Sequence, residues 1–240
     1  MTQYLTAREV SSELQKRINE LVPNWATQVP DLGLRLAEAI ADEPDQVLTK
    51  MSYEEFLREF EGQFAEWEDG KVILMSPVSR RHQQLLGFLI HLLSSFVEVE
   101  QSGEILFAPF QMRLAKIQRG REPDLIFIKT ENLSRLKSNF LDGPADIAVE
   151  IISPESVDRD RNVKFRECAQ AGVPEYWLID PENEIAEFFL LGSTGSYQVA
   201  DMDADGYHSR ALSGLVIHPT WFWQMPLPAV RPILRNMGIA

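Results

Sequence analysis

Hydrophobic residues recur at helical spacing in several parts of this chain. Apolar residues three and four positions apart share one face of a helix, so the spacing predicts helices over residues 7–22, 32–41, 52–60, 79–99 and 157–171. Ser52 followed by Glu55 is a capping-box pattern at the start of the third helix. Gly172 ends the last helix, with Pro174 just beyond it. The helix over 79–99 is the longest, and its apolar stripe includes His82.

Short apolar runs rich in β-branched and aromatic residues alternate with these helices. They predict strands over 64–75, 105–114, 121–129, 147–152, 175–180, 184–191, 197–200 and 208–212. The first run contains Asp69 and Gly70, so we expect it to fold as a β-hairpin. We interpret Trp221-Phe-Trp223 as a segment that closes the core, with a base-stacking platform as the alternative. Helices mixed with strands in this order predict an α/β or α+β fold, with a mixed central sheet flanked by helices.

The chain is expected to have two parts. Residues 1–46 form a predicted helical extension that ends in an acidic linker with a proline, and residues 47–240 form the main domain. A disordered tail is the competing interpretation of residues 1–46, although their apolar content favours packing on the main domain or on a partner. At 240 residues with 45% hydrophobic content, the chain has enough apolar surface for a packed core.

Composition narrows the setting in which we expect the protein to work. No apolar run approaches the length of a membrane span, and the first residues lack the pattern of a secretory signal. Cys168 is the single cysteine, which excludes an internal disulfide framework and a zinc site built from several cysteines. We therefore expect a cytoplasmic protein without a membrane partner.

Charge is unevenly distributed along the sequence. The formal net charge of −13 argues against nonspecific nucleic-acid binding, which depends on lysine and arginine. Residues 1–70 carry 15 acidic and 6 basic side chains, whereas residues 113–166 carry 9 acidic and 11 basic ones. The second segment contains the candidate site, so the net charge does not exclude a nucleic-acid substrate. Scattered, solvated surface charge is the other interpretation of this distribution.

Two carboxylates interrupt strands that are otherwise hydrophobic: Asp124 precedes the run Leu-Ile-Phe-Ile, and Glu150 lies within Ile-Ala-Val-Glu-Ile-Ile. A buried carboxylate is costly without a compensating cation. If the strands are neighbours in register, both carboxylates reach one hard cation such as Mg²⁺ or Mn²⁺, with the backbone carbonyl of Ile151 as a third ligand. The alternatives are that Asp124 caps a turn after Pro123 and that Glu150 pairs with an arginine.

Lys164 lies between Val163 and Phe165 and borders the apolar face of its predicted helix. An interior lysine is costly, so it usually pairs with a carboxylate or loses its proton. Beside a metal-bound water it would position or deprotonate the nucleophile and stabilise the charged phosphorane. A surface lysine that extends its amine into water is the alternative.

Two more residues are candidates for the same site. Glu66 lies in the predicted hairpin and would add a carboxylate to the metal, unless it is an exposed hairpin residue. His82 would hydrogen-bond a carboxylate ligand or contact a phosphate, although a lone histidine on an apolar stripe is more often structural. The candidate site therefore consists of Asp124, Glu150, Lys164, Glu66 and His82, with Asp124, Glu150, Glu66 and the Ile151 carbonyl as metal ligands.

Several motifs in combination resemble one protein family. They are Met51-Ser-Tyr-Glu-Glu-Phe56, Glu66-Trp-Glu-Asp-Gly70, Met75-Ser-Pro77, Arg81-His82, Pro123-Asp124, Val149-Glu150-Ile-Ile-Ser-Pro-Glu155-Ser156, Asp160-Arg161, Lys164 and Ala171-Gly-Val-Pro-Glu-Tyr-Trp-Leu-Ile-Asp180. Together they span about residues 50 to 225. In this combination the chain resembles the Uma-type restriction-endonuclease-like proteins of the PD-(D/E)xK nuclease superfamily.

The resemblance implies the restriction-endonuclease-like fold, with a mixed central sheet flanked by helices. It also implies a metal-dependent nuclease site at Asp124 and Glu150, which Glu66 joins. In the wider superfamily the lysine lies two residues after the glutamate, where this chain has Ile152. The resemblance implies a variant whose lysine has moved to the next helix, which matches Lys164.

Two positions depart from the pattern that the resemblance implies. Cys168 stands where a tyrosine is common, and Glu122 stands where a glutamine is common. Neither departure removes an implied metal ligand.

These observations support three hypotheses about function. The leading one is a Mg²⁺- or Mn²⁺-dependent endonuclease that hydrolyses the phosphodiester bonds of DNA. The second is a non-catalytic binding or regulatory protein that keeps the nuclease fold, with a homodimer joined through residues 1–46. An acidic surface and the lack of a recognisable DNA-reading module favour it. The third is hydrolysis of a small phosphate ester or nucleotide, which would turn over mononucleotides but not DNA.

Overall fold

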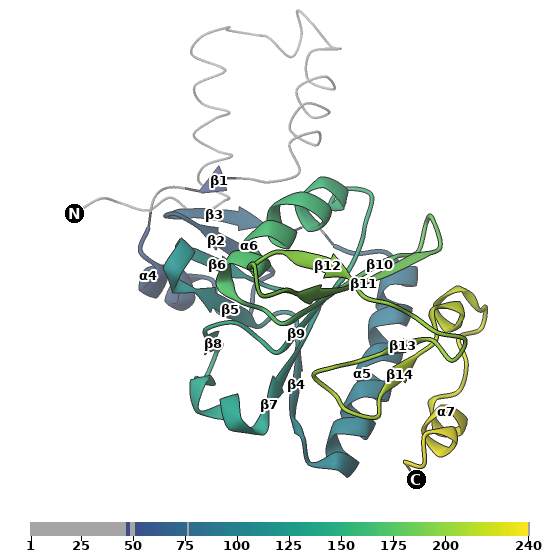
Figure 1. Ribbon diagram of the computed structural model, residues 1–240. Coiled ribbons are helices and arrows are strands. Elements are labelled where there is room, and N and C mark those ends of the chain that lie inside the picture. Colours follow the sequence, from purple (N-terminus) through teal and green to yellow (C-terminus); the bar gives the residue numbers. More distant parts are fainter. Residues whose placement is uncertain (1–46, 49–50, 76, 240) are drawn as a thin grey trace, which may run out of the picture. The chain divides into compact units, whose positions relative to one another are not determined.

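The computed structural model describes residues 47–48, 51–75 and 77–239 (Figure 1). The predicted helices over 7–22 and 32–41, and the predicted extension over 1–46 that contains them, lie outside the described residues. The boundary between that extension and the main domain therefore stays a prediction.

The described strands form two six-stranded sheets and one two-stranded sheet. The first sheet has the order β1 (Val47–Leu48), β3 (Lys71–Leu74), β2 (Ala65–Glu68), β6 (Arg119–Arg121), β5 (Gln111–Leu114) and β8 (Phe140–Asp142). The second has the order β12 (Tyr197–Val199), β11 (Ile185–Leu191), β10 (Glu175–Asp180), β9 (Ile147–Ile151), β7 (Leu125–Lys129) and β4 (Gly103–Phe107). The two-stranded sheet pairs β13 (Tyr207–His208) with β14 (Val216–Ile217). Each large sheet combines parallel and antiparallel pairs, so the predicted mixed-sheet fold is confirmed.

The helices flank these sheets. The α-helices are α4 (Tyr53–Glu59), α5 (Arg80–Glu100), α6 (Phe165–Ala171) and α7 (Val230–Asn236). The others are the π-helix η3 (Arg159–Lys164) and the 3₁₀ turns η1 (Ala115–Ile117), η2 (Thr130–Arg135) and η4 (Pro219–Trp223). The predicted capping box is present, because Ser52 Oγ accepts from Glu55 N and Glu55 Oε2 accepts from Ser52 N. In the part of the chain that the structure describes, no helix combines the length and apolarity that crossing a membrane requires.

Two predicted strands are each divided between the two large sheets. Residues 105–114 contribute to β4 in the second sheet and β5 in the first, with Pro109 between them. Residues 121–129 contribute to β6 in the first sheet and β7 in the second, with Pro123 between them. Proline has no N–H to donate to a ladder and restricts the residue before it, so a strand rarely continues through it. The prediction of a single strand in each segment was wrong.

Other short elements also differ from the prediction. Only the first residue of the strand expected over 208–212 belongs to one, β13. The strands β8 and β14 and the helix α7 were not predicted, since two to seven residues show too little periodicity to be recognised. The helix expected over 157–171 is present, but its residues 159–164 form the π-helix η3.

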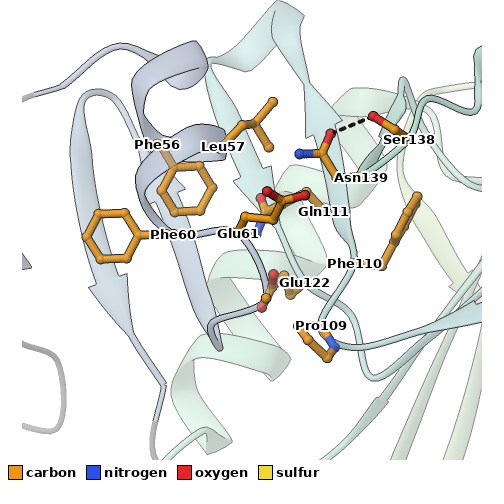
Figure 2. Close-up of a pocket in the computed structure, with 11 residues that line it drawn as sticks. Phe56, Leu57, Phe60, Glu61, Pro109, Phe110, Gln111, Glu122, Ser138 and Asn139 are labelled. Carbon is orange, nitrogen blue, oxygen red and sulfur yellow. Dashed lines mark hydrogen bonds between the residues drawn. The ribbon is translucent and has the colours of Figure 1, made fainter.

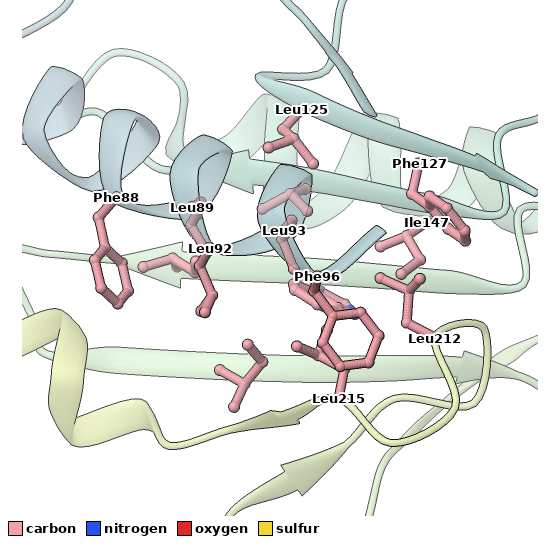
Figure 3. Close-up of a cluster of buried hydrophobic side chains, with 14 of the residues drawn as sticks. Phe88, Leu89, Leu92, Leu93, Phe96, Leu125, Phe127, Ile147, Leu212 and Leu215 are labelled. Atoms are coloured by element: carbon pink, nitrogen blue, oxygen red, sulfur yellow. The ribbon is translucent and has the colours of Figure 1, made fainter. Parts of the chain in front are cut away.

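The main core lies between α5 and one face of the second sheet (Figure 3). Leu89 and Phe96 of α5 pack in the same buried cluster as Leu125 and Phe127 of β7 and Ile147 of β9. Successive side chains of a strand point to opposite faces of the sheet, so the residue between Leu125 and Phe127 faces away from this core. Phe222 is fully buried in this cluster, as predicted.

A second core covers the opposite face of the second sheet. Ile126 and Ala148 lie in it together with Met112 of β5 and Cys168 of α6. The first sheet and α6 therefore contact the face that carries the side chain of Glu150, two residues after Ala148. This junction of two sheets and a helix positions the candidate site.

Candidate active site

Asp124 and Glu150 lie opposite each other at one end of a strand pair. β7 and β9 are antiparallel, and Leu125 pairs with Val149. Asp124 directly precedes Leu125 and Glu150 directly follows Val149, so the two acidic residues face each other across the pair. Side chains directly opposite on neighbouring strands project to the same face. The predicted neighbouring arrangement of the two strands is confirmed.

Asp124 is held by one backbone contact and one side-chain contact. Its Oδ2 accepts a hydrogen bond from the backbone N–H of Ile151, with the two atoms 2.7 Å apart. His82 Nε2 lies 3.1 Å from the same oxygen, and His82 is buried on the inner side of α5. The hydrogen bond predicted between His82 and a carboxylate is thus present, with Nε2 as the donor. Ile151 contributes its N–H here, and a ligand role for its carbonyl stays a prediction.

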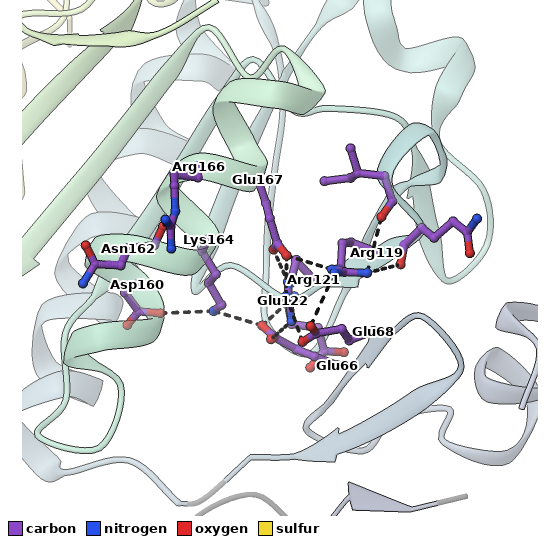
Figure 4. Close-up of polar contacts among 12 residues, drawn as sticks. Glu66, Glu68, Arg119, Arg121, Glu122, Asp160, Asn162, Lys164, Arg166 and Glu167 are labelled. Atoms are coloured by element: carbon purple, nitrogen blue, oxygen red, sulfur yellow. Dashed lines mark hydrogen bonds and ion pairs between the residues drawn. The ribbon is translucent and has the colours of Figure 1, made fainter. Parts of the chain in front are cut away.

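Lys164 lies among three carboxylates. Its Nζ is 2.9 Å from Glu66 Oε1 and 3.0 Å from Glu150 Oε1. A third contact, of 3.4 Å, joins it to Asp160 Oδ1 (Figure 4). The side chain is 2% exposed, so the alternative of a lysine extended into water is wrong. Burial disfavours the charged amine, but the three carboxylates outweigh this effect and raise the pKa of Lys164 well above its ordinary value.

The π-helix η3 brings Asp160 and Lys164 to the same place. A π-helical turn is wider than an α-turn and often occurs at functional sites. Asp160 is buried and lies four residues before Lys164. Tyr176 of β10 donates its hydroxyl hydrogen to the backbone carbonyl of Asp160, at 3.0 Å. This bond ties η3 to the second sheet, beside the strand that carries Glu150.

Glu66 has a cation on each of its carboxylate oxygens. Oε1 contacts Lys164, and Oε2 lies 3.0 Å from Nη1 of Arg121. Glu66 is fully buried, so its interpretation as an exposed hairpin residue is wrong. Burial alone would raise its pKa, but the two cations outweigh burial and lower the pKa of Glu66 to about 2. Glu66 therefore carries its negative charge throughout the neutral range.

Arg121 joins Glu66 to α6. Its Nε and Nη2 donate to the two carboxylate oxygens of Glu167, at 2.7 and 2.9 Å, which is a bidentate pair. Nη2 also lies 3.3 Å from Glu68 Oε2. Burial disfavours the charged guanidinium, but Glu66 and Glu167 outweigh this and raise the pKa of Arg121 above its ordinary value. Figure 4 shows that the network runs from β2 and β6 to η3 and α6.

The chemistry of this donor set fits a divalent cation at Asp124 and Glu150. Burial, together with the neighbouring carboxylates, raises the pKa of Glu150 well above its ordinary value against the opposing effect of Lys164. Glu150 Oε1 forms an ion pair with Lys164 Nζ at 3.0 Å but accepts no hydrogen bond of regular geometry within the described part of the chain. A cation added beside Glu150 would stabilise the charged form of its carboxylate and would give Oε1 a further partner. Carboxylate oxygens are the ligands that Mg²⁺ and Mn²⁺ prefer.

The number of side-chain ligands is limited. Over residues 51–75 and 77–239, no group of three or more His, Cys, Asp and Glu side chains is placed to hold a metal ion. Mg²⁺ usually takes one or two protein carboxylates and completes its coordination with water and substrate oxygens. Two carboxylates are therefore sufficient for an ion of this kind.

Glu122 is a further buried carboxyl next to this network. Its backbone N–H lies 3.3 Å from Glu66 Oε1, and its own Oε2 accepts from the backbone N–H of Ala65 at 3.2 Å. Burial raises the pKa of Glu122 to about 8, against the opposing hydrogen bonds from Gln111 and Ala65. Glu122 is one of the two positions that depart from the pattern implied by the motif resemblance.

We expect the free energy of unfolding to fall less between acidic and alkaline pH in Glu122→Gln than in the wild type. An ordinary glutamate loses its proton near pH 4.5, whereas Glu122 in the folded protein keeps it until about pH 8. Between these values the folded protein holds a proton that the unfolded chain has lost. The free energy of unfolding of the wild type therefore falls as the pH rises, by up to about 4 kcal/mol, and the variant lacks this contribution.

Urea denaturation at about pH 5 and about pH 9 checks this expectation, with the midpoint and slope measured at each pH. Glu182→Gln, at an exposed carboxyl, is the matched control and should follow the wild type. Identical pH dependence in wild type and Glu122→Gln would contradict the prediction.

The structure places the five predicted site residues in two contact groups, Asp124 with His82 and Lys164 with Glu66 and Glu150, which meet at the paired ends of β7 and β9. Their catalytic and metal-binding roles stay predictions. The structure also adds Arg121, Asp160 and Glu167, which were not predicted as site residues. Asp160 precedes Lys164 by four residues, a spacing that suits an ion pair on a helix and was a usable signal. Nothing local pairs Arg121 with Glu167, which lies 46 residues away.

A solved structure shares this fold. The crystal structure of a "putative nuclease belonging to DUF820" from Anabaena variabilis matches with a TM-score of 0.57 and 17% sequence identity, over 66% of this chain and 89% of that chain. At this level of identity the likeness shows the fold alone. The protein therefore has the nuclease-like fold that its sequence predicts.

A family model then identifies the family. The model named Uma2, with the description "Putative restriction endonuclease", matches residues 51–219, which is well over half of the chain. The chain belongs to the Uma2 family, and the resemblance seen in its motifs is confirmed. The comparison with curated proteins finds no match. Family and fold together support a nuclease.

Proposed function

We propose that this protein is a divalent-metal-dependent endonuclease that hydrolyses phosphodiester bonds in DNA. The observation that carries the proposal is the meeting of Asp124 and Glu150 across two strands, with the ammonium of Lys164 beside Glu150. Membership of the Uma2 family and the nuclease-like fold support the same class of reaction.

Asp124 and Glu150 are the proposed metal ligands, with the backbone carbonyl of Ile151 as a third. A bound Mg²⁺ or Mn²⁺ lowers the pKa of a coordinated water and offsets charge on the phosphate. His82 and the N–H of Ile151 hold Asp124 in one orientation, which limits the reorganisation needed when the site is loaded.

Lys164 is proposed to act as a charged group. Its raised pKa supports a role in stabilising negative charge on the phosphate, rather than one as the base that deprotonates water. Glu66 holds Lys164 from one side, and Asp160 holds it from another. Both oxygens of Glu66 already contact cations, so Glu66 would bind a metal only after releasing one of them.

The test combines cleavage with metal binding. We expect the full-length protein to cleave plasmid DNA with Mg²⁺ or Mn²⁺ and to lose this activity with a chelator. Calorimetry should detect Mn²⁺ binding to the wild type, and Asp124→Ala should abolish it while the circular dichroism spectrum is unchanged. Asp201→Ala, at an exposed carboxylate, is the matched control and should bind Mn²⁺ normally. Equal Mn²⁺ binding by Asp124→Ala and the wild type would refute this ligand assignment.

One observation favours the alternative of a non-catalytic protein that keeps the fold. Lys164 already supplies a cation to Glu66, Glu150 and Asp160, so these carboxylates have a partner without a metal. The net charge of −13 also disfavours a DNA partner. A folded wild type that binds neither Mg²⁺ nor Mn²⁺ in calorimetry would support this alternative.

A further inference from the structure

A cavity of about 200 Å³ lies between α4, with the turn after it, and the start of β5. Figure 2 shows Phe56 and Phe60 on one side and Phe110 on the other, with Gln111 and Glu122 between them. None of these residues belongs to the proposed metal site. The cavity therefore requires its own explanation.

Aromatic side chains line two sides of the cavity. The rings of Phe56 and Phe60 are stacked, with centroids 5.7 Å apart and planes inclined by 21°. Phe56 is buried, whereas Phe60 and Phe110 are half-buried, so part of each of these two rings remains accessible. A flat ring system can stack on such faces.

The polar side chains between these rings are anchored on one backbone position. Gln111 Nε2 donates to the carbonyl of Ala65 at 2.7 Å, and Glu122 Oε2 accepts from the N–H of Ala65 at 3.2 Å. Gln111 is 4% exposed, and within the described chain its Oε1 has no hydrogen-bond partner. A ligand with an N–H donor would complement Gln111 Oε1.

Charge and size exclude some ligands. Glu61 and Glu122 line the cavity, and the described residues that line it include neither lysine nor arginine. A phosphate group would therefore meet the charge of Glu61 without a compensating cation, whereas an uncharged group would not. Glu122, which is protonated below about pH 8, adds no charge at neutral pH. The volume is below the range of about 300 to 1,000 Å³ that suits drug-sized ligands, so the cavity fits one ring system rather than a whole nucleotide.

The cavity is linked directly to the candidate active site. The backbone N–H of Glu122 lies 3.3 Å from Glu66 Oε1, the oxygen that contacts Lys164. Glu122 also precedes Asp124 by two residues. A group bound in the cavity would therefore lie close along the chain to the residues proposed to act on the phosphodiester.

We propose that this cavity binds one unpaired, amino-bearing nucleobase of the nucleic-acid strand, stacked against Phe60 and Phe110 with its amino group toward Gln111 and Glu122. The inference rests on the proposed function, because it takes that strand to be the substrate. Adenine and cytosine carry the required exocyclic amine, whereas thymine does not. Stacking of one base on an aromatic side chain changes affinity by roughly 10- to 100-fold.

The test uses the full-length protein and single-stranded oligonucleotides in EDTA. One oligonucleotide contains only thymine, and the other has one central 2-aminopurine, a fluorescent adenine analogue. We expect binding to change the 2-aminopurine fluorescence and to be about 10-fold tighter for the second oligonucleotide. Phe110→Leu should abolish this preference, and the matched control Phe107→Leu, at a phenylalanine that is 48% exposed outside the cavity, should retain it. Phe60→Leu provides a second test if Phe110→Leu does not fold.

The outcomes separate this inference from the proposed function when metal-dependent cleavage is measured on the same preparations. Cleavage without any base preference overturns the base site and leaves the nuclease proposal standing. A preference lost in Phe110→Leu, without cleavage under any metal condition, supports the base site and overturns the nuclease proposal. A preference that Phe110→Leu and Phe60→Leu both retain overturns the base site. No oligonucleotide binding overturns the base site, and the cleavage measurement then decides the nuclease proposal by itself.

Discussion

Glu150→Gln is expected to reduce metal-dependent DNA cleavage by about 1,000-fold or more while the protein stays folded. Glutamine keeps the shape of the side chain but removes the charge that a divalent ion needs. Loss of such a ligand costs several kcal/mol in the transition state, and each 1.4 kcal/mol is tenfold in rate. Because burial and neighbouring carboxylates already disfavour the charge on Glu150, a neutral side chain should not lower the melting temperature.

Single-turnover cleavage of plasmid DNA and thermal unfolding measure the two parts of this prediction. Glu184→Gln, at an exposed carboxylate in the turn between β10 and β11, is the matched control and should retain wild-type cleavage. Undiminished cleavage by a folded Glu150→Gln variant would remove Glu150 from the metal site. Unfolding of the variant would instead mean that the Lys164 ion pair is required for stability.

Arg121→Met is expected to lower the free energy of unfolding by about 3 to 5 kcal/mol. Arg121 is 1% exposed and contacts both Glu66 and Glu167. Methionine would fill much of the volume but would leave Glu167 without its bidentate partner and Glu66 with Lys164 alone. An uncompensated buried charge costs far more than the ion pair itself contributes.

Arg119→Met is the matched control for this prediction. Arg119 lies on the same strand and contacts Glu167 Oε1 at 2.7 Å, but its side chain is 22% exposed. Water can therefore replace much of that interaction, and we expect a loss of about 1 kcal/mol or less. Urea denaturation measures both variants, and the double variant Arg121→Met/Glu167→Gln should recover part of the loss. Equal losses in the two single variants would show that burial of Arg121 does not determine its contribution.

Local signals predicted most of the fold. The Ser52 capping box, the turn at Asp69 and Gly70, and the apolar stripe of α5 each depend on residues within a few positions of one another. Two of the failures occurred at Pro109 and Pro123, where the chain passes from one sheet to the other. Each proline marked a break, but which sheet a strand joins depends on pairing with distant segments.

The candidate site was also predicted only in part, because some of its signals are local and others depend on distant segments. Carboxylates in apolar strands, at Asp124 and Glu150, and a lysine on an apolar helix face, at Lys164, are costly unless they interact, so each was recognisable alone. The alternatives for Glu66 were left open because a hairpin of four-residue strands does not reveal which face another sheet covers. Its burial and its two cationic partners appear only in the folded protein.

The sequence by itself determined which side chains are expensive to bury, because the cost of removing a charge from water is a property of the residue and its immediate apolar neighbours. Only the tertiary structure decided how those costs are offset. The contacts of Lys164 with Glu66 and Glu150, the Arg121 bridge to Glu167 and the aromatic cavity beside Glu122 all bring together residues from separate elements. Such contacts depend on distances of a few ångströms, which packing sets and local patterns do not encode.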